Sequence, residues 1–274
     1  MAGCVRELGT TLQRLMEARR LAADLVVQFT QAANATNLAV MADSDEGAAT
    51  YARESQQKTE AVQKEVDALR PILVDLGYSN ESRLLDQFAT QFTQLRSLDR
   101  SILELAIEST NLKAQRLSFR DAQEAATAFG DAIESAASKA PAPDAWHAKA
   151  LSAGAVAALR QIQVLQAPHI AEADDEAMTR MEAQMKASAD EARSALMALT
   201  GLVPSARSQI AAASAALDRF IDLNAQITEL SRRNSNVRSL ALSLGQRRKL
   251  TAACEDSLRA LRDTLEKREF TATR

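Results

Sequence analysis

The densest group of residues able to do chemistry lies around one predicted helix boundary, where His169 and Glu172 precede the acidic run 174–176. A His-x-x-Glu spacing puts an imidazole and a carboxylate on one face of a helix, where they could bind a metal ion. Acidic residues at a helix start are also stabilised by the helix dipole and the free amides there. A similar acidic segment at 43–46 has no histidine, which favours capping. We therefore expect no metal site.

Catalytic motifs are absent from the sequence. There is no nucleophile elbow, phosphate-binding loop, cysteine redox motif or His-Glu zinc motif. The chain has 2 His, too few for a di-iron helical bundle. His147 follows Trp146 in a Pro-rich segment without partner residues. The chain is predicted to have no enzymatic activity and no cofactor.

A more informative set consists of polar residues that interrupt or flank apolar helical seams. Buried polar groups need partners, so each marks a hydrogen-bond network, a register device or a ligand site. The helix lengths predicted below put these residues at about the same height along the bundle axis, where two helical bundles are expected to meet. There it could bind a small polar or anionic ligand, or form salt bridges to the acidic turns. The candidate ligand-binding residues are Ser109, Asn111, Lys113, Arg116, His169, Arg180, Asn234 and Arg238.

The composition indicates what kind of fold must position these residues. The 274 residues are rich in Ala, Leu, Glu, Gln and Arg, with 8 Gly, 5 Pro and 4% aromatics, which is typical of helical proteins. The net charge of −3 gives no basic surface for nucleic acid. Cys4 and Cys254 do not have the spacing of metal ligands, and they do not indicate a disulfide framework. No apolar run approaches the ~20 residues that span a bilayer, so the chain is expected to be soluble.

Helix-breaking segments divide the chain into six predicted helices, of roughly 40, 30, 60, 30, 30 and 65 residues. If consecutive helices run antiparallel, helices of these lengths would form two four-helix bundles, one stacked on the other. The predicted fold class is therefore all-α. A kink in the third predicted helix near Ser118, or in the sixth near Gly245, would not change this arrangement of the helices. The breaks lie at 43–46, 77–80, 139–144, 174–175 and 203–205. The seam of the third helix is predicted to run through Leu84, Phe88, Gln91, Leu95, Leu98, Ile102, Leu105, Ser109, Leu112, Arg116 and Phe119.

The chain also repeats itself. ADSDEGAAT (42–50) returns as AEADDEAMT (171–179), LLDQF (84–88) as ALDRF (216–220), and TNLKAQRLSF (110–119) as SNVRSLALSL (235–244). The offset stays within about 125–132 positions, as in a tandem duplication. We therefore expect a first helical repeat at 1–139, a Pro/Ala hinge at 140–146 and a second helical repeat at 147–274.

The segments ILEL (102–105) and TNLKAQRLSF (110–119), with the second copy NSNVRSLALSL (234–244), resemble the extracytoplasmic four-helix-bundle sensor modules of bacterial methyl-accepting chemoreceptors and sensor kinases. Two stacked bundles resemble the helical bimodular subclass. The resemblance implies a dimeric, periplasmic, non-enzymatic ligand sensor between two transmembrane helices. Those helices and the signalling segments are absent here, so the chain is either excised from a receptor or a free-standing relative.

The sequence thus predicts a ligand-sensing input domain for chemotaxis or related signal transduction, acting by helix displacement. A parallel homodimer through the first helix and a small polar or anionic ligand are the expected partners. Contact with a membrane would come only through segments absent from this chain. The alternative is a scaffolding helical-bundle protein that binds a partner helix and no small molecule. A lipid-surface role is disfavoured, because no stretch pairs a basic face with exposed bulky apolar residues.

Overall fold

The computed structural model describes residues 2–268, and their side chains from residue 9 onward. These residues form helices joined by short turns, with no β-strand among them, so the expected all-α fold is confirmed. The helical segments are α1 (Ala2–Val40), α2 (Asp45–Asp75), α3 (Ser79–Glu108), α4 (Thr110–Arg116), the π-helix η1 (Leu117–Ala122), α5 (Gln123–Ala137), α6 (Ala145–Ala171), α7 (Asp175–Leu202), the 3-10 turn η2 (Pro204–Ala206), α8 (Arg207–Arg233), α9 (Ser235–Leu242), the π-helix η3 (Ser243–Arg247) and α10 (Arg248–Lys267).

Several predicted helix boundaries coincide with capping residues. The Ser44 hydroxyl accepts the backbone N–H of Gly47 at the start of α2, at 3.2 Å. The Asp174 carboxylate accepts the N–H of Ala177 at the start of α7, at 2.7 Å. After α2, Gly77 has a φ of 69°, a left-handed conformation that glycine adopts without steric cost. Both acidic segments therefore stand at helix N-termini, where negative charge is stabilised.

The helices group into two compact units. Of the described residues, unit 1 contains 2–108 and 238–268, and unit 2 contains 109–237. Each unit takes helices from both sequence repeats. The segment 140–146, expected to be a hinge between repeats, falls at the turn that joins α5 to α6 inside unit 2.

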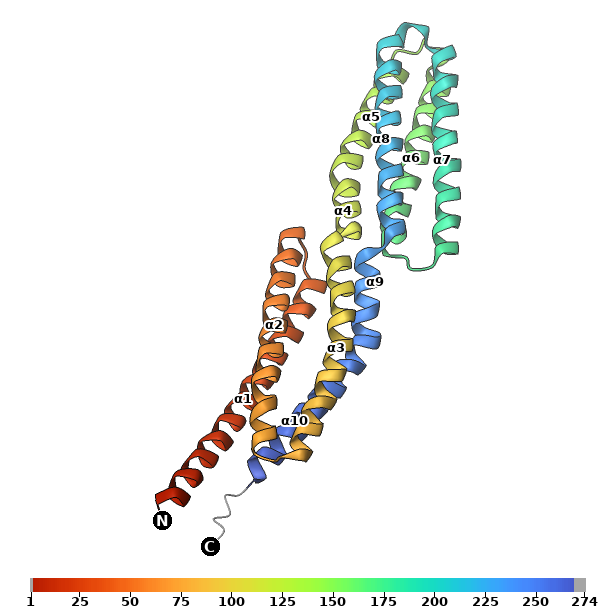
Figure 1. Cartoon of the computed structure of the whole chain (residues 1–274). Coiled ribbons are helices and arrows are strands. Elements are labelled where there is room, and N and C mark those ends of the chain that lie inside the picture. The colour runs from red at the N-terminus through yellow and green to blue at the C-terminus, as the bar shows by residue number, and fades with distance from the viewer. Residues whose placement is uncertain (1, 269–274) are drawn as a thin grey trace. The chain divides into compact units, whose positions relative to one another are not determined.

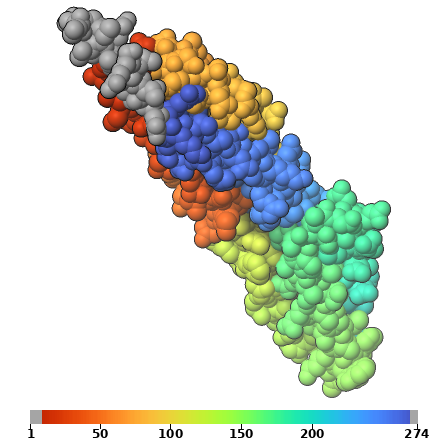
Figure 2. Space-filling view, turned by 90° about the horizontal axis from the view of Figure 1, so that it is seen from below, coloured from red at the N-terminus to blue at the C-terminus, as the bar shows by residue number. Residues whose placement is uncertain are grey.

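In unit 1, α1, α2, α3 and α10 pack side by side around one apolar core (Figure 1). Figure 2 shows α10, in dark blue, on the surface of this unit. At the centre, the rings of Phe29 and Phe88 meet edge to face with centroids 5.7 Å apart, and Phe88 stacks on Phe92 at 5.4 Å. Such aromatic pairs contribute about 0.5–1.5 kcal/mol each beyond the burial of their area.

In unit 2, α5, α6, α7 and α8 surround a second core (Figure 1). Phe129, Ile133 and Phe220 are fully buried there. Many neighbouring core positions are alanine, which lets the helix backbones approach closely. These small side chains fill the space between α6 and α7, the pair with the most extensive packing in the unit.

The apolar seam predicted for the third helix is wrong beyond Ser109. Phe88 lies in the core as expected, but Arg116 and Phe119 are exposed, and Phe129 fills the core of unit 2 instead. Ser109 has a left-handed backbone (φ 51°) that interrupts the helix. The π-helical turn η1 then shifts the register again, since it holds an extra residue per turn. A periodicity argument assumes an unbroken α-helix and cannot follow either change.

In the second copy of the repeat, the helix is interrupted in the same way. Asn234 has a φ of 55°, Arg238 beyond it is exposed, and the π-helix η3 follows. A π-helical turn thus lies at each of the two positions that were considered for a kink, near Ser118 and near Gly245. The breaks at Ser109 and Asn234 were not predicted.

No helix in the described part of the chain is both long enough and apolar enough to cross a bilayer. Cys254 is a free thiol buried in the core of unit 1. Cys4 lies outside the residues whose side chains are described.

Candidate functional site

The two copies of the repeated Thr/Ser-Asn segment hydrogen-bond to each other inside unit 2. The N–H of Thr110 donates to Oγ of Ser235 at 2.9 Å, and the N–H of Ser235 donates to Oγ1 of Thr110 at 3.0 Å. One residue further on, the N–H groups of Asn111 and Asn236 each donate to the other residue's Oδ1, both at 3.1 Å. The helices α4 and α9 therefore cap each other's first amides, which have no partner within their own helix.

The asparagine side chains extend this network to the end of α6. Nδ2 of Asn111 donates to the carbonyl of Ile170 at 2.6 Å and to Oδ1 of Asn234 at 2.9 Å. Nδ2 of Asn234 donates to the carbonyl of Glu172 at 2.6 Å. Three predicted site residues, Ser109, Asn111 and Asn234, thus lie together, and both asparagine amides bond protein atoms.

His169 is fully buried in unit 2, among polar groups of α7 and α8. Its Nδ1 lies 2.8 Å from Oγ of Ser231, and its Nε2 lies 2.9 Å from Oε1 of Glu182. The Ser231 hydroxyl donates to the His169 carbonyl at 2.7 Å. The Arg232 guanidinium binds both oxygens of Glu182, at 2.7 and 3.0 Å, and holds the pKa of that carboxyl below its ordinary value.

The two members of the His-x-x-Glu pair have different partners. The Glu172 carboxylate accepts the backbone N–H groups of Ala173 and Asp174, at 2.8 and 2.9 Å. Within the described residues, no three His, Cys, Asp or Glu side chains lie close enough together to hold a metal ion. At this turn the acidic residues therefore act as caps.

The remaining candidates are Lys113, Arg116, Arg180 and Arg238. Lys113 and Arg116 line a shallow cavity of about 360 Å³ on unit 2, with Leu117 and the pair 120–121. Arg180 is exposed and lies 4.0 Å from Glu176, one turn away on α7. Arg238 is exposed and belongs to unit 1. Neither Arg116 nor Arg238 is thus a buried guanidinium in a helical seam.

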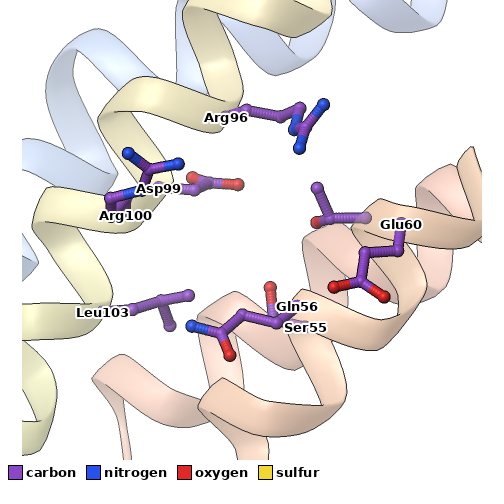
Figure 3. Close-up of a pocket in the computed structure, with 8 residues that line it drawn as sticks. Ser55, Gln56, Glu60, Arg96, Asp99, Arg100 and Leu103 are labelled. Atoms are coloured by element: carbon purple, nitrogen blue, oxygen red, sulfur yellow. The ribbon is translucent and has the colours of Figure 1, made fainter. Parts of the chain in front are cut away.

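A different polar cavity, which the sequence did not reveal, lies between α2 and α3 in unit 1 (Figure 3). Its volume is about 200 Å³. Arg96 and Arg100 stand one turn apart on α3, and Figure 3 shows Asp99 of α3 and Glu60 of α2 on opposite sides of the cavity. The lining comprises Ser55, Gln56, Thr59, Glu60, Arg96, Asp99, Arg100 and Leu103.

Asp99 connects this cavity to the last long helix. Its Oδ1 accepts a hydrogen bond from Nε of Arg247, the final residue of η3, at 2.6 Å. The two side chains are only 13% and 4% exposed. Arg247 also donates to Oδ1 of Asn37 at 2.9 Å and to the carbonyl of Ala33 at 3.1 Å. Burial raises the pKa of the Asp99 carboxyl, and the attraction of Arg247 offsets this only in part.

Hydroxyl groups continue the polar layer across the unit. The hydroxyls of Thr36 on α1 and Ser55 on α2 are 2.8 Å apart, and both residues are buried. This layer divides the large core of unit 1 from a small apolar cluster formed by Val40, Ile102 and Ala106. A polar layer of this kind fixes which side chains face each other, because any other register would leave buried polar groups unpaired.

The sequence contained little that could have identified this cavity. Arg96 and Arg100 have the spacing of an ordinary solvated helix face, and 148 positions separate Asp99 from Arg247. The only local signal was that Arg247 closely follows Gly245, a position considered for a kink.

Comparisons with protein-family models, with curated proteins and with solved structures gave no match to this chain.

Proposed function

We propose that the chain is the ligand-sensing input domain of a bacterial transmembrane chemoreceptor or sensor kinase, and that it acts in the periplasm. The proposal extends the sequence resemblance and includes its arrangement, six antiparallel helices in two stacked four-helix bundles. The observation that supports it best is the cavity between α2 and α3, which is lined by two arginines of α3 and by polar residues of α2.

Arg96 and Arg100 suit a small ligand that carries an anionic or strongly polar group. A guanidinium binds a carboxylate or phosphate through paired hydrogen bonds. Arg96 donates to Oε1 of Gln63 at 3.1 Å, and its guanidinium carbon lies 5.8 Å from the centre of the Phe92 ring. These contacts position the arginine before any ligand arrives, which lowers the entropic cost of binding.

The connection through Asp99 supplies a route for signalling. Asp99 lies between the two arginines on α3, and its carboxylate holds Arg247 of η3. A ligand that draws Arg96 and Arg100 towards α2 would shift α3, and the buried ion pair would carry that shift to η3 and α10. Small sliding of packed helices is a recognised mode of conformational signalling.

The experiment is a thermal-unfolding screen against carboxylates, amino acids and polyamines. A ligand at about one hundred times its Kd adds about 2.7 kcal/mol of stability, which raises Tm measurably. We expect Arg96→Ala with Arg100→Ala to abolish the ligand-induced shift in a chain that still folds. Arg259→Ala, at an exposed ion pair on α10, is the matched control and should keep the shift. If no compound in the screen stabilises the chain, the scaffolding alternative is favoured.

The proposal includes a parallel homodimer through α1. Leu12, Met16, Val27 and Leu38 are 44–62% exposed. At about 100° per residue, their spacing puts all four on one face of the helix. Sedimentation at rising concentration tests the interface: Val27→Glu should weaken self-association, and Gln57→Glu, at an exposed polar position of α2, should not. A chain that stays monomeric through the high-micromolar range would count against a self-sufficient interface.

A further inference from the structure

We propose that a groove between α1 and the segment η3–α10 binds a small uncharged amphipathic molecule, with an apolar body and one hydroxyl group. All residues that line this α1–α10 groove belong to unit 1. It lies across the unit from the α2–α3 cavity, because α1, α2, α3 and α10 follow one another around the core. Binding in the groove does not depend on the function proposed above.

The α1–α10 groove has the size and lining of a small-molecule site. Its volume is about 420 Å³, compared with about 200 Å³ for the α2–α3 cavity. Pockets for small molecules usually measure about 300–1,000 Å³ and are mostly apolar, with a few polar groups. The apolar lining comprises Val40 and Met41 of α1, Leu240 of α9, Leu244 of η3 and Ala252 of α10.

Three of these apolar side chains are left exposed when the chain folds. Met41 is 77% exposed, Leu244 is 62% exposed and Leu240 is 44% exposed. Large apolar side chains gathered at one place on a surface usually mark a binding site. A stable protein interface takes about 20–30 residues from each partner, many more than line this groove. A small molecule is therefore the occupant that fits it better.

The charges around the groove favour an uncharged occupant. Arg247 lines the groove, but its guanidinium is buried and paired with the Asp99 carboxylate. Arg248 and Glu255 line it at exposed positions, about two turns apart on α10. These opposite charges cancel, and both can stay hydrated when the groove is filled. An anionic or cationic head group therefore gains no net attraction from the lining.

Thr251 supplies a hydrogen-bonding group for the hydroxyl of the occupant. Its Oγ1 is buried and has no hydrogen-bond partner among the described residues. Other threonines inside helices donate to the carbonyl four residues back, as Thr30, Thr90 and Thr264 do. For Thr251 that residue is Arg247, the end of the π-helical turn η3, and the bond is not made. Rotation about its Cα–Cβ bond turns the hydroxyl towards the groove, where it can pair with a bound hydroxyl.

An occupant of the groove contacts the residue that connects the two sides of unit 1. Arg247 lines the α1–α10 groove, and its partner Asp99 lines the α2–α3 cavity. The two sites therefore meet the same buried ion pair from opposite sides.

The test uses 1-octanol as the probe and begins with the wild-type chain. In methyl NMR of the methionines, 1-octanol should shift the signal of Met41 and leave that of Met197, which is 68% exposed on α7 in unit 2. In calorimetry, 1-octanol should bind several times more tightly than octanoate or octylammonium. No shift at Met41, equal shifts at both methionines, or tighter binding of either ion would overturn the proposal.

Variants then locate the contacts within the groove. Leu244→Gln should weaken 1-octanol binding several-fold, and Val164→Gln, at a similarly exposed apolar position in unit 2, should not. Thr251→Val removes the hydroxyl and nearly keeps the shape, so it should weaken binding about two- to tenfold, as for one net hydrogen bond. Val27→Glu, on the α1 face proposed for self-association, should leave the affinity unchanged. Loss of binding in Val27→Glu would mean that two copies form the site, and it would overturn a site within one chain.

Discussion

Thr110 and Ser235 each donate a backbone N–H to the other's side-chain hydroxyl, at 2.9 and 3.0 Å, although 125 positions separate them in the chain. They hold equivalent places in the internal repeat, and each follows a residue with a left-handed backbone. The duplicated segment thus builds its own contact, because each copy supplies the cap that the other lacks.

Removing one of these hydroxyls should destabilise unit 2 with the magnitude of a lost helix cap. We expect Thr110→Val and Ser235→Ala each to cost about 0.5–2 kcal/mol in urea unfolding. The double variant should cost less than the sum, because the two hydroxyls also share one bond, from Oγ1 of Thr110 to Oγ of Ser235 at 3.2 Å, which either single change already removes. Thr30→Val, on the exposed face of α1, is the control and should change stability by less than about 0.5 kcal/mol. Strict additivity would show that the two caps act independently.

The ion pair of Asp99 and Arg247 should be costly to break from either side. Removing one partner leaves a buried charge without its counter-ion, so Asp99→Asn and Arg247→Met should each lose about 3–5 kcal/mol. Replacing both, as Asp99→Asn with Arg247→Met, should cost less than either single change. The measurement is a double-mutant cycle from urea unfolding, and a double variant less stable than both singles would contradict it.

The thiol of Cys254 should be unreactive while the chain is folded. Burial raises its pKa to about 12, and the negative charges of Asp99 and Glu255 add to the effect. The thiolate is the reactive form, so at pH 8 very little is present. In a Cys4→Ser background, we expect alkylation at least about a hundredfold slower in buffer than in urea. Similar rates, followed by mass spectrometry, would mean that this core opens readily.

Acid should remove the stabilising contribution of Glu81. This carboxylate is 1% exposed and accepts bonds from Arg268 at 2.7 and 2.9 Å, and these bonds hold its pKa below the ordinary value of 4.5. A lowered folded-state pKa contributes stability above the unfolded-state value and loses it as pH falls. The stability difference between wild type and Glu81→Gln should therefore be present at pH 7 and shrink below about pH 4.5. Glu54→Gln, at an exposed position of α2, should show no such trend.

Local chemistry made the helices and most of their ends predictable. Ser44 and Asp174 cap helices where the sequence placed breaks, and Gly77 ends a turn that needs a left-handed residue. Side-chain and backbone requirements of this kind lie within a few residues, so a single sequence reveals them. The apolar seam of the third predicted helix could likewise be predicted as far as Ser109, where the first unpredicted break occurs.

What the sequence could not reveal depends on contacts between distant segments. Ser109 has no local reason to adopt a left-handed backbone, and its helix is broken because Ser235 and Asn236 cap the segment that follows. His169 was selected for its chemistry, but its partners on α7 and α8 could not be read from spacing. Arg247 and Asp99 were missed because they lie 148 positions apart and little in the neighbouring sequence distinguishes them from solvated charges.

The division of the chain into units also sets an order of folding. Unit 2 is one continuous stretch, residues 109–237, whereas unit 1 needs α10, which follows that stretch in sequence. At about 5–20 residues per second, synthesis of the intervening segment takes roughly ten seconds. During that interval, the apolar surface of α1, α2 and α3 that α10 later covers is exposed to the solvent. Unit 1 is therefore the later of the two to close, and the stage at which a nascent chain is most exposed to aggregation falls before α10 emerges.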